Sequence, residues 1–360
     1  MHDATPDELA DWDARTVEAP GGHVYQSRAW ADHRRRSAWE PRFLITADGG
    51  RVLALTRPWS IVGGGSAYLP RGPVVGAPSV LASRQVAVAD ALAGDGIDVV
   101  AADPEVPASM TEFRDAITGA GFEPIEEIQP SRHRISLPLD GHAEDEVFAA
   151  ISRSTRQRVQ KAADDLERVV RHDRRSGPNP GDEFAAPSED TGTALDRFYD
   201  LLLETGERRH FTFGPRDAFV AWWRSAFEAG HLIYLEAWGI RGAPLAGLIL
   251  YRHGGRLSTV HSSDHAAARS EHPGALHLLR WRAIQLAIRE GCSEMDLGGV
   301  DVAGARGEPR EGDPLYGLYQ HKRAFGGRWL ELTGAHERVF DARGYALGRL
   351  TGRLARLAGR

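Results

Sequence analysis

The 360-residue chain has almost no cysteine and no long apolar run. Cys292 is its single cysteine, which excludes a disulfide framework and a zinc site built from cysteines. No apolar segment approaches the roughly 20 residues that a membrane-spanning helix needs. The acidic amino terminus is followed by no hydrophobic segment, so no secretory signal is visible. We therefore expect a cytoplasmic protein.

Lysine is scarce in an otherwise ordinary globular composition. Hydrophobic residues make up 42% and charged residues 26% of the chain, and its length favours two domains over one core. The net charge of −6 excludes the global basic field of a dedicated nucleic-acid binder. Lys161 and Lys322 are the only lysines among 44 basic residues. A lysine that persists beside so many arginines is either a chance survivor or is needed as lysine.

The same order of predicted elements occurs twice in the chain: helical segments, three strands, a helix, a strand, a helix and a strand. In the first half these segments are 27–36, 43–46, 52–59, 66–75, 83–94, 97–103, 110–122 and 132–139. In the second half they are 191–209 with 217–229, then 232–238, 245–252, 255–263, 274–291, 292–298, 314–327 and 328–334. A helix over about 144–171 and a polar surface loop over 174–192 separate the halves.

This order is that of an acyl-CoA N-acyltransferase (GNAT-like) domain, and two copies make a tandem. We therefore predict an α/β fold with mixed sheets, of the α+β kind, in two tandem GNAT-like domains. The first domain comprises residues 1–143 and 328–360, and the second comprises 144–327. Coincidence among α/β elements is the alternative, and the matched order of at least six elements argues against it.

Two glycine-containing segments are candidates for a site. PRGPVV (70–75) forces an irregular exit from a strand, which is either a structural turn or a bend that presents Arg71 at a cleft. MDLGGV (295–300) runs into Gly298 and Gly299. Adjacent glycines permit either a bulge, which we favour for this segment alone, or close approach of the backbone to a ligand.

Two basic helical segments also stand out. GLYQHKRAFGG (317–327) places Tyr319 and Lys322 three residues apart, on one helix face. The lysine is either an exposed residue of an amphipathic helix or a group aimed at a ligand. The segment 153–161 carries four basic residues that either form a solvated face, which we favour, or touch phosphates of an RNA partner.

The carboxyl-terminal segment 343–360 alternates leucines with arginines as a basic amphipathic helix does. Such a helix packs on the body of the protein or lies on an anionic membrane surface. The histidines offer no metal site, because their spacing fits no usual set of ligands. Those considered were His261, His265, His272 and His277.

A common loop of GNAT-like domains is missing from both halves. Acetyl-CoA-binding members carry Gln/Arg-x-x-Gly-x-Gly/Ala before a helix, where backbone N–H groups hold the pyrophosphate. The equivalent segments, 76–85 and 270–279, do not fit this pattern. We therefore expect no bound cofactor, and the fold alone must not decide the function.

Six segments taken together resemble the Fem family of peptidoglycan-bridge aminoacyltransferases. They occur in the same order between about residues 25 and 335, namely QSRAWADHR (26–34), AYLPRGPVV (67–75), RFYDLLLETGERRHF (197–211), HPGALHLLRW (272–281), MDLGGV (295–300) and GLYQHKRAFGG (317–327). The resemblance implies two tandem GNAT-like domains, with the end of the chain returning to complete the first. It also implies transfer of an amino acid from aminoacyl-tRNA to the stem peptide of lipid II or UDP-MurNAc-pentapeptide.

The resemblance assigns roles by position. Arg34 and Arg209, with Arg208 as the alternative register, correspond to ligands of the precursor phosphates. Lys322 falls on the family lysine near the reacting carbonyl. We further expect Arg71 and Tyr319 to contact substrate.

The chain departs from the family pattern at three places. His321 replaces the usual aromatic residue before Lys322, and His261 or Ser262 stands where a tyrosine often lines the cleft. Gly76 occupies the position of an aspartate once suspected as a base, which leaves no carboxylate base at that position.

The sequence thus predicts a cytoplasmic, tRNA-dependent aminoacyltransferase that acts on a peptidoglycan precursor, in peripheral contact with the inner membrane face where the acceptor is lipid-linked. The partners implied are aminoacyl-tRNA and the precursor, with no metal. Three alternatives remain: the same transfer to an amine of a secondary metabolite, a CoA-dependent N-acyltransferase, and a tandem domain that binds precursor or tRNA without catalysis.

Overall fold

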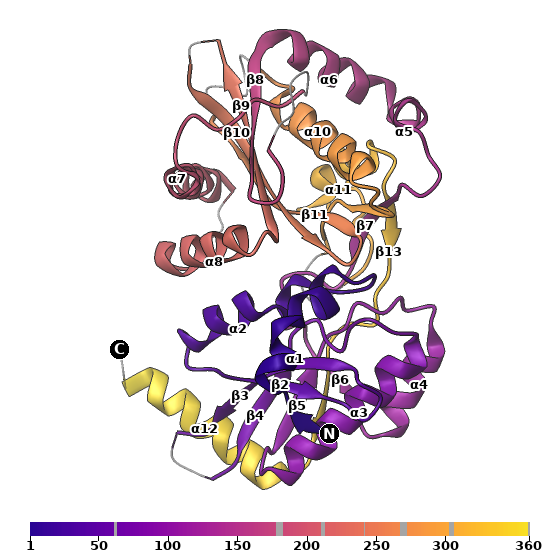
Figure 1. Ribbon diagram of the computed structural model, residues 1–360, viewed down its shortest axis with the longest axis vertical. Helices are drawn as coiled ribbons and strands as arrows, with labels where there is room; N and C mark the ends of the chain where they lie inside the picture. The colour runs from indigo at the N-terminus through magenta and orange to yellow at the C-terminus, as the bar shows by residue number, and fades with distance from the viewer. Residues whose placement is uncertain are drawn as a thin grey trace. The chain divides into compact units, whose positions relative to one another are not determined.

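The computed structural model describes residues 1–60, 63–177, 183–209, 213–240, 242–266, 272–301 and 306–358, without the side chains of Arg209 and 352–358. The chain forms two compact units, each built on a seven-stranded sheet (Figure 1). The first unit comprises 1–134, 301–308 and 330–360, and the second comprises 135–300 and 309–329.

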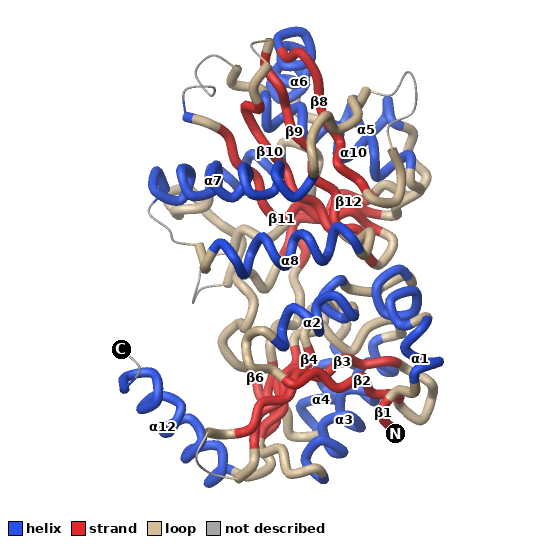
Figure 2. The backbone as a smooth tube through the Cα atoms, turned by 60° about the vertical axis from the view of Figure 1, so that its left-hand side comes forward, coloured by secondary structure: helices blue, strands red, loops and turns tan. Residues whose placement is uncertain are grey.

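The first unit has strand order β1-β2-β3-β4-β5-β14-β6. Helices α3 and α4 cover one face, where apolar side chains such as Val88 and Phe113 join the core, and α2 lies on the other (Figure 2). Its elements are β1 (His2–Asp3), α1 (Pro6–Ala10), η1 (Ala14–Glu18), η2 (Val24–Gln26), α2 (Arg28–Arg35), β2 (Glu40–Ile45), β3 (Arg51–Pro58), β4 (Gly65–Leu69), α3 (Pro78–Gly94), β5 (Val99–Ala102), α4 (Thr111–Gly119), β6 (Glu123–Pro124), β14 (His336–Val339) and α12 (Ala342–Ala358).

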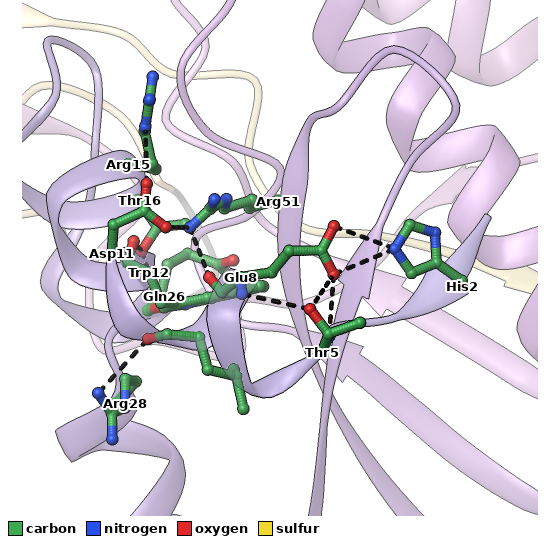
Figure 3. A network of polar contacts seen from close by, with 11 residues as sticks. His2, Thr5, Glu8, Asp11, Trp12, Arg15, Thr16, Gln26, Arg28 and Arg51 are labelled. Atoms are coloured by element: carbon green, nitrogen blue, oxygen red, sulfur yellow. Dashed lines mark hydrogen bonds and ion pairs between the residues drawn. The ribbon is translucent and has the colours of Figure 1, made fainter.

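A polar network fixes the amino-terminal segment against this sheet (Figure 3). Thr5 caps α1, and the carboxylate of Glu8 accepts a hydrogen bond from the Thr5 backbone N–H at 2.9 Å. Arg51 of β3 donates to the Glu8 carbonyl at 2.7 Å. The buried side chain of Gln26 bridges Leu53 and the carbonyl of Pro70. These bonds fix the start of α2, the helix that carries Arg34.

The second unit has strand order β13-β7-β12-β11-β10-β9-β8. Helices α5, α6 and α10 pack on one face around the apolar core, while α7 and α8 cover the other (Figure 2). Its elements are β7 (Arg134–Pro138), α5 (Glu144–Ala150), α6 (Arg153–Asp165), β8 (Leu166–Asp173), α7 (Thr191–Arg209), α8 (Arg216–Glu228), β9 (Leu232–Gly239), β10 (Pro244–His253), β11 (Arg256–Asp264), α10 (Ala275–Arg289), β12 (Glu294–Asp296), α11 (Tyr316–Arg323) and β13 (Arg328–Leu330).

The two sheets repeat one topology. Each holds a parallel pair among antiparallel neighbours, β4 with β5 and β11 with β12. In each sheet the strand after this pair comes from the other half of the sequence, β14 in the first sheet and β7 in the second. The repeat seen in the sequence is thus a structural repeat with one strand exchanged.

Three local predictions need correction. The predicted helix over 144–171 is two helices, which end at Asp165, and a strand from Leu166 to Asp173 that pairs with β9. The predicted strand over 132–139 forms, but it belongs to the second sheet because Leu137 pairs with Met295. The observed division of the chain at 134/135 therefore precedes the predicted boundary at 143/144.

Candidate functional site

The parallel pair of the second sheet is short, and its regular pairing ends near the carboxyl ends of the two strands. β11 pairs with β12 over three positions and the pairing ends at Ser258 and Asp296. Beyond this point the chain of β12 continues along β7, since Leu297 N–H donates to the Ile135 carbonyl at 2.8 Å and Ile135 N–H donates to the Gly298 carbonyl at 3.3 Å. The bonding to β7 thus continues past the point where the regular pairing with β11 ends.

A bulge in β11 lies at the same point. Leu250 of β10 pairs with Thr259, whereas the preceding Ile249 pairs with His261, which leaves Val260 as the additional residue. Bulges of this kind redirect side chains and are common beside active sites.

Lys322 lies at the end of the parallel pair. Its side chain comes from α11, it is only 6% exposed, and its Nζ donates to the Gly299 carbonyl at 3.1 Å. Gly298 has a φ of +80°, and a Cβ there would lie 3.1 Å from this Nζ and 2.9 Å from the Thr259 carbonyl oxygen. The paired glycines therefore serve close approach of a buried cation to the backbone.

His261 sits in an aromatic cluster on the α8 side of the sheet. Its ring centroid lies 6.3 Å from that of Phe213, 5.8 Å from Phe219 and 5.6 Å from Trp223. Burial lowers the pKa of His261 to about 4, so the ring is neutral at physiological pH. The adjacent Ser262 is partly exposed, and the alternation of the strand directs it to the opposite face.

The other predicted residues of α11 differ in their surroundings. Tyr319 is buried in the hydrophobic core, and its hydroxyl accepts a hydrogen bond from Arg323 at 2.6 Å. The Nε2 of His321 contacts Nη1 of the buried Arg280 in α10. Burial and the nearby cations lower the pKa of His321 to about 2.

The two candidate arginines of α7 end the helix. The side chain of Arg209 lies outside the described part of the chain. Arg208 donates to the hydroxyl of Thr205 at 2.7 Å and to the backbone carbonyl of Asp264 at 2.8 Å. Arg208 thus connects α7 to the end of β11.

The basic residues of α6 are engaged locally. Arg156 donates to the carbonyl of Ile151 at 3.0 Å, and Lys161 pairs with Asp165 at 2.7 Å, four residues along the helix. Arg158 approaches Nε2 of His277 at 3.5 Å. Most of this face is therefore a solvated helix surface, as we favoured from the sequence.

In the first unit, a polar network lies at the carboxyl end of the parallel pair formed by β4 and β5. Asp103 follows β5 and is fully buried. Its carboxylate accepts hydrogen bonds from the Tyr68 hydroxyl at 2.9 Å and from the Arg71 backbone N–H at 2.7 Å. The Arg71 guanidinium lies 3.7 Å from the Asp103 carboxylate and donates to the carbonyl of Ser131 at 3.0 Å. Burial raises the pKa of Asp103 to about 6.

Arg34 lies near this network on α2. Its guanidinium carbon is 5.4 Å from the ring centroid of Trp30 and 5.7 Å from that of Trp39. In the described chain Arg34 pairs with no carboxylate, and its buried Nε has no hydrogen-bond partner. Arg57 stacks on the same Trp39 at 4.3 Å, and a groove of about 730 Å³ lined by Trp39, Arg57 and Trp59 adjoins them. Cations on indole rings beside an open groove suit an anionic, ring-containing ligand.

Sequence reasoning missed two groups at these sites. Asp103 directly follows an apolar strand, and a polar residue at the carboxyl end of a buried parallel strand is a signal for a site. Arg280 and His277 lie on the buried side of α10. The signal was an arginine inside the apolar run from Leu278 to Trp281, where a charged side chain is unusual unless it is paired.

No three His, Cys, Asp or Glu side chains come together as metal ligands in the ranges that the structure covers. In the same ranges, every helix is too short or too polar to span a bilayer.

Comparison with known proteins identifies the class of the fold. Residues 153–323 match the family described as "Acetyltransferase (GNAT) domain". The crystal structure of FemX superposes with a TM-score of 0.77 at 17% identity, covering 96% of this chain and 98% of that one. No curated protein matches the chain at a significant level.

Two other solved structures share the fold at lower similarity. L-PGS from Bacillus licheniformis gives a TM-score of 0.52 at 12% identity, covering 98% of both chains. The C-terminal domain of an Agrobacterium fabrum protein assigned as a lysylphosphatidylglycerol synthetase gives 0.51 at 12% identity, covering 91% of both. These comparisons confirm the predicted Fem-like tandem fold, and the GNAT domain confirms that the protein is an acyltransferase.

Proposed function

We propose that this acyltransferase, with its Fem-like tandem fold, transfers an amino acid from aminoacyl-tRNA to an amine on the stem peptide of a peptidoglycan precursor, lipid II or UDP-MurNAc-pentapeptide. The observation that carries the proposal is Lys322. It is a buried cation at the carboxyl end of the parallel pair of β11 and β12, within the GNAT domain.

Lys322 suits the chemistry of aminoacyl transfer. An aminoacyl ester is already activated, so the enzyme mainly has to align the acceptor amine with the ester carbonyl. When the amine attacks, the carbonyl oxygen gains negative charge, and a preorganised cation in a dry site stabilises it. The C–N bond forms, the ester C–O bond breaks, and the ribose hydroxyl of the tRNA takes up a proton as it leaves. The attacking amine loses its proton to the substrate or to water, since no carboxylate base is assigned.

The first unit supplies groups for an acceptor. Lipid II and its UDP-linked form carry a diphosphate, which arginine recognises well. Arg34 is held over two indole rings without a carboxylate partner in the described chain, and Arg57 borders the groove that adjoins it. This arrangement supports a role for the first unit in holding the acceptor.

The donor is inferred from three features together. Neither half of the sequence has the pyrophosphate loop of CoA-binding domains. The fold is shared with FemX, and with a protein whose name denotes synthesis of lysylphosphatidylglycerol. These features support an aminoacyl donor over acetyl-CoA.

The location follows from the acceptor. We place the protein in the cytoplasm, with peripheral contact to the inner membrane face when the acceptor is lipid-linked. Leu347 and Leu350 of α12 are about half exposed, at 50% and 55%, and Arg349 lies between them. Exposed leucines beside arginine suit contact with an anionic lipid surface.

A transfer assay tests the proposal. Purified protein is incubated with UDP-MurNAc-pentapeptide, or a soluble lipid II analogue, and with total tRNA charged with a mixture of amino acids. We expect a tRNA-dependent gain of one amino-acid residue in the mass of the precursor. A mass gain with acetyl-CoA in place of tRNA would instead establish a CoA-dependent acyltransferase. No gain in either reaction would contradict the proposal and favour another amine as acceptor or a binding role.

A further inference from the structure

Arg280 is a buried arginine that lacks a carboxylate. It lies on α10 and is 3% exposed. Within the described chain, its one hydrogen-bonding contact joins Nη1 to Nε2 of His321, and its buried Nε has no partner. Arg252, a partly buried arginine of the same unit, pairs with Asp173 at 2.8 Å and with Glu290. Burying a cation without a carboxylate lowers the free energy of unfolding. Arg280 carries this cost and Arg252 does not.

Further nitrogen groups gather around Arg280. The rings of His277 and His321 meet edge to face with centroids 4.5 Å apart, and both rings lie within 6.1 Å of Phe325. Arg280 stacks on the same Phe325, its guanidinium carbon 5.7 Å from the ring centroid. Arg158 of α6 approaches Nε2 of His277 at 3.5 Å. Helices α6, α10 and α11 thus each contribute a nitrogen-bearing side chain to one cluster.

The cluster has hydrogen-bond donors without acceptors. Because Nε2 of His277 faces the N–H of Arg158, this nitrogen must accept, and the proton lies on Nδ1. That Nδ1 is buried and has no partner in the described chain, as is also true of Nε of Arg280. Buried donors are nearly always satisfied in proteins, so a missing acceptor is the natural explanation for both.

The electrostatics of the cluster favour an anion. Burial lowers the pKa of Arg280 to about 10, and burial with the neighbouring arginines lowers the pKa of His277 to about 4. No acidic side chain of the described chain pairs with Arg280, His277 or His321. The cluster therefore holds positive charge in a poorly solvated place, and an oxyanion would neutralise it.

We propose that Arg280, His277 and His321, with Arg158 at the edge, form a binding site for an oxyanion of the phosphate class. The guanidinium offers a planar fork of donors that matches phosphate oxygens, and the histidine N–H adds one more. The site uses His321, which departs from the aromatic residue of the resembled family. It is a site apart from Lys322, which contacts Gly299.

The identity of the phosphate rests on the proposed function. His321 immediately precedes Lys322 in α11, so the oxyanion would bind close to the transfer centre. Both substrates of the proposed reaction carry phosphates, the RNA donor as phosphodiesters and the acceptor as a diphosphate. In either case Arg280 is a positioning residue that holds a substrate by its phosphate.

Thermal unfolding of the full chain with inorganic pyrophosphate tests the site. We expect pyrophosphate to raise the Tm of the wild type more than sodium chloride of equal ionic strength does. Arg280→Met should unfold at a higher Tm than the wild type without anion, because it removes an unpaired buried charge, and should bind pyrophosphate at least about tenfold more weakly. The matched control Arg252→Met should lower the Tm, because it leaves the carboxylates of Asp173 and Glu290 without their arginine partner. It should keep the full response to pyrophosphate.

Two further variants keep the test interpretable. Arg280→Lys retains charge but not the fork, and His321→Phe removes one member of the cluster with similar volume. Both should weaken pyrophosphate binding while folding normally. A pyrophosphate response that is unchanged in Arg280→Met and His321→Phe, or absent from the wild type, would overturn the site.

Steady-state kinetics then separates the two phosphate sources. If the site holds the donor, Arg280→Lys raises KM for the charged tRNA and leaves KM for the precursor unchanged. If the site holds the acceptor, Arg280→Lys raises KM for the precursor and leaves KM for the charged tRNA unchanged. Failure of the proposed function is distinguishable, because binding of pyrophosphate at Arg280 requires no transfer activity. Conversely, tRNA-dependent transfer with normal KM values in Arg280→Lys would overturn the positioning role and leave the proposed function intact.

Discussion

The parallel pair of each sheet ends beside a buried carboxylate, but the groups that approach these two ends differ, although the two sheets share one topology. In the first unit, Asp103 fills this place with a carboxylate that receives hydrogen bonds from Tyr68 and the Arg71 backbone. In the second unit, the pair ends at Asp296, whose carboxylate accepts a hydrogen bond from the Gly298 N–H at 2.7 Å, and the ammonium of Lys322 donates to the carbonyl of Gly299. A buried, bonded carboxylate organises a binding surface, whereas a buried cation can stabilise charge that develops on oxygen. The proposed function assigns the holding of a substrate to the first unit and transfer to the second.

Replacing Lys322 should have the largest effect. Lys322→Met should lower kcat for transfer about 10²- to 10³-fold, because it removes the cation that stabilises the transition state. The matched control is Lys161→Met, since Lys161 is the only other lysine and pairs with Asp165 on an exposed helix. Equal rates for Lys322→Met and the wild type in a single-turnover assay would refute the assigned role.

Asp103→Asn should destabilise the first unit. The substitution leaves Arg71 without its nearest carboxylate and places an amide N–H against donors, which costs about 3 kcal/mol of the free energy of unfolding. Tyr68→Phe removes one hydrogen bond to the same carboxylate and should cost about 1 kcal/mol. Urea unfolding measures both values. Two variants of equal stability would show that Asp103 does not organise this network.

Gly298→Ala tests the close approach at the second parallel pair. A Cβ there would lie 3.1 Å from Nζ of Lys322, and φ at this glycine is +80°, which costs about 1–2 kcal/mol for alanine. Gly291→Ala is the matched control, because φ there is +69° but no atom lies within 4 Å of its Cβ. We expect strain from the positive φ in both variants, a larger loss of stability in Gly298→Ala because its Cβ would also lie 2.9 Å from the Thr259 carbonyl oxygen, and a loss of transfer activity in Gly298→Ala alone. Full activity in Gly298→Ala would show that the contact with Lys322 is dispensable.

The smallest effect concerns the pH dependence of stability. An unfolded histidine takes up a proton near pH 6.5, whereas His261 stays neutral in the folded chain until about pH 4. The free energy of unfolding therefore falls as pH drops from 6.5 towards 4, by about 1 kcal/mol at pH 5.5 for this residue. His261→Phe should reduce that loss in urea titrations at pH 7.5 and 5.5, and His142→Gln, an exposed control, should not. An unaltered pH dependence in His261→Phe would contradict the burial of a neutral ring.

The sequence predicted most elements of the repeat but not how they assemble. The strand exchange of β7 and β14 depends on pairing between residues far apart in the chain, which local patterns do not encode. The strand from Leu166 was predicted as helix because its apolar residues Leu166, Val169 and Val170 also fit helical spacing, and pairing with β9 decided the outcome.

The candidate site was predictable only in part. Lys322 stood out because lysine is so scarce, whereas for the glycines before it we favoured a bulge and close approach of the backbone was only the alternative. Asp103 and Arg280 were missed because their significance depends on burial and on partners from other elements. Single-sequence patterns reveal unusual residue types, whereas the pairing of charges is a property of the folded chain.

Equilibrium binding of UDP-MurNAc-pentapeptide to two variants most directly tests the proposal that the first unit holds the acceptor and the second carries out transfer. Isothermal titration calorimetry should show that Lys322→Met binds the precursor with an affinity close to that of the wild type, because we propose that the first unit holds the acceptor. Arg34→Met should lose about tenfold in affinity, because it removes the arginine assigned to the diphosphate. Loss of binding in Lys322→Met together with unchanged binding in Arg34→Met would contradict the account.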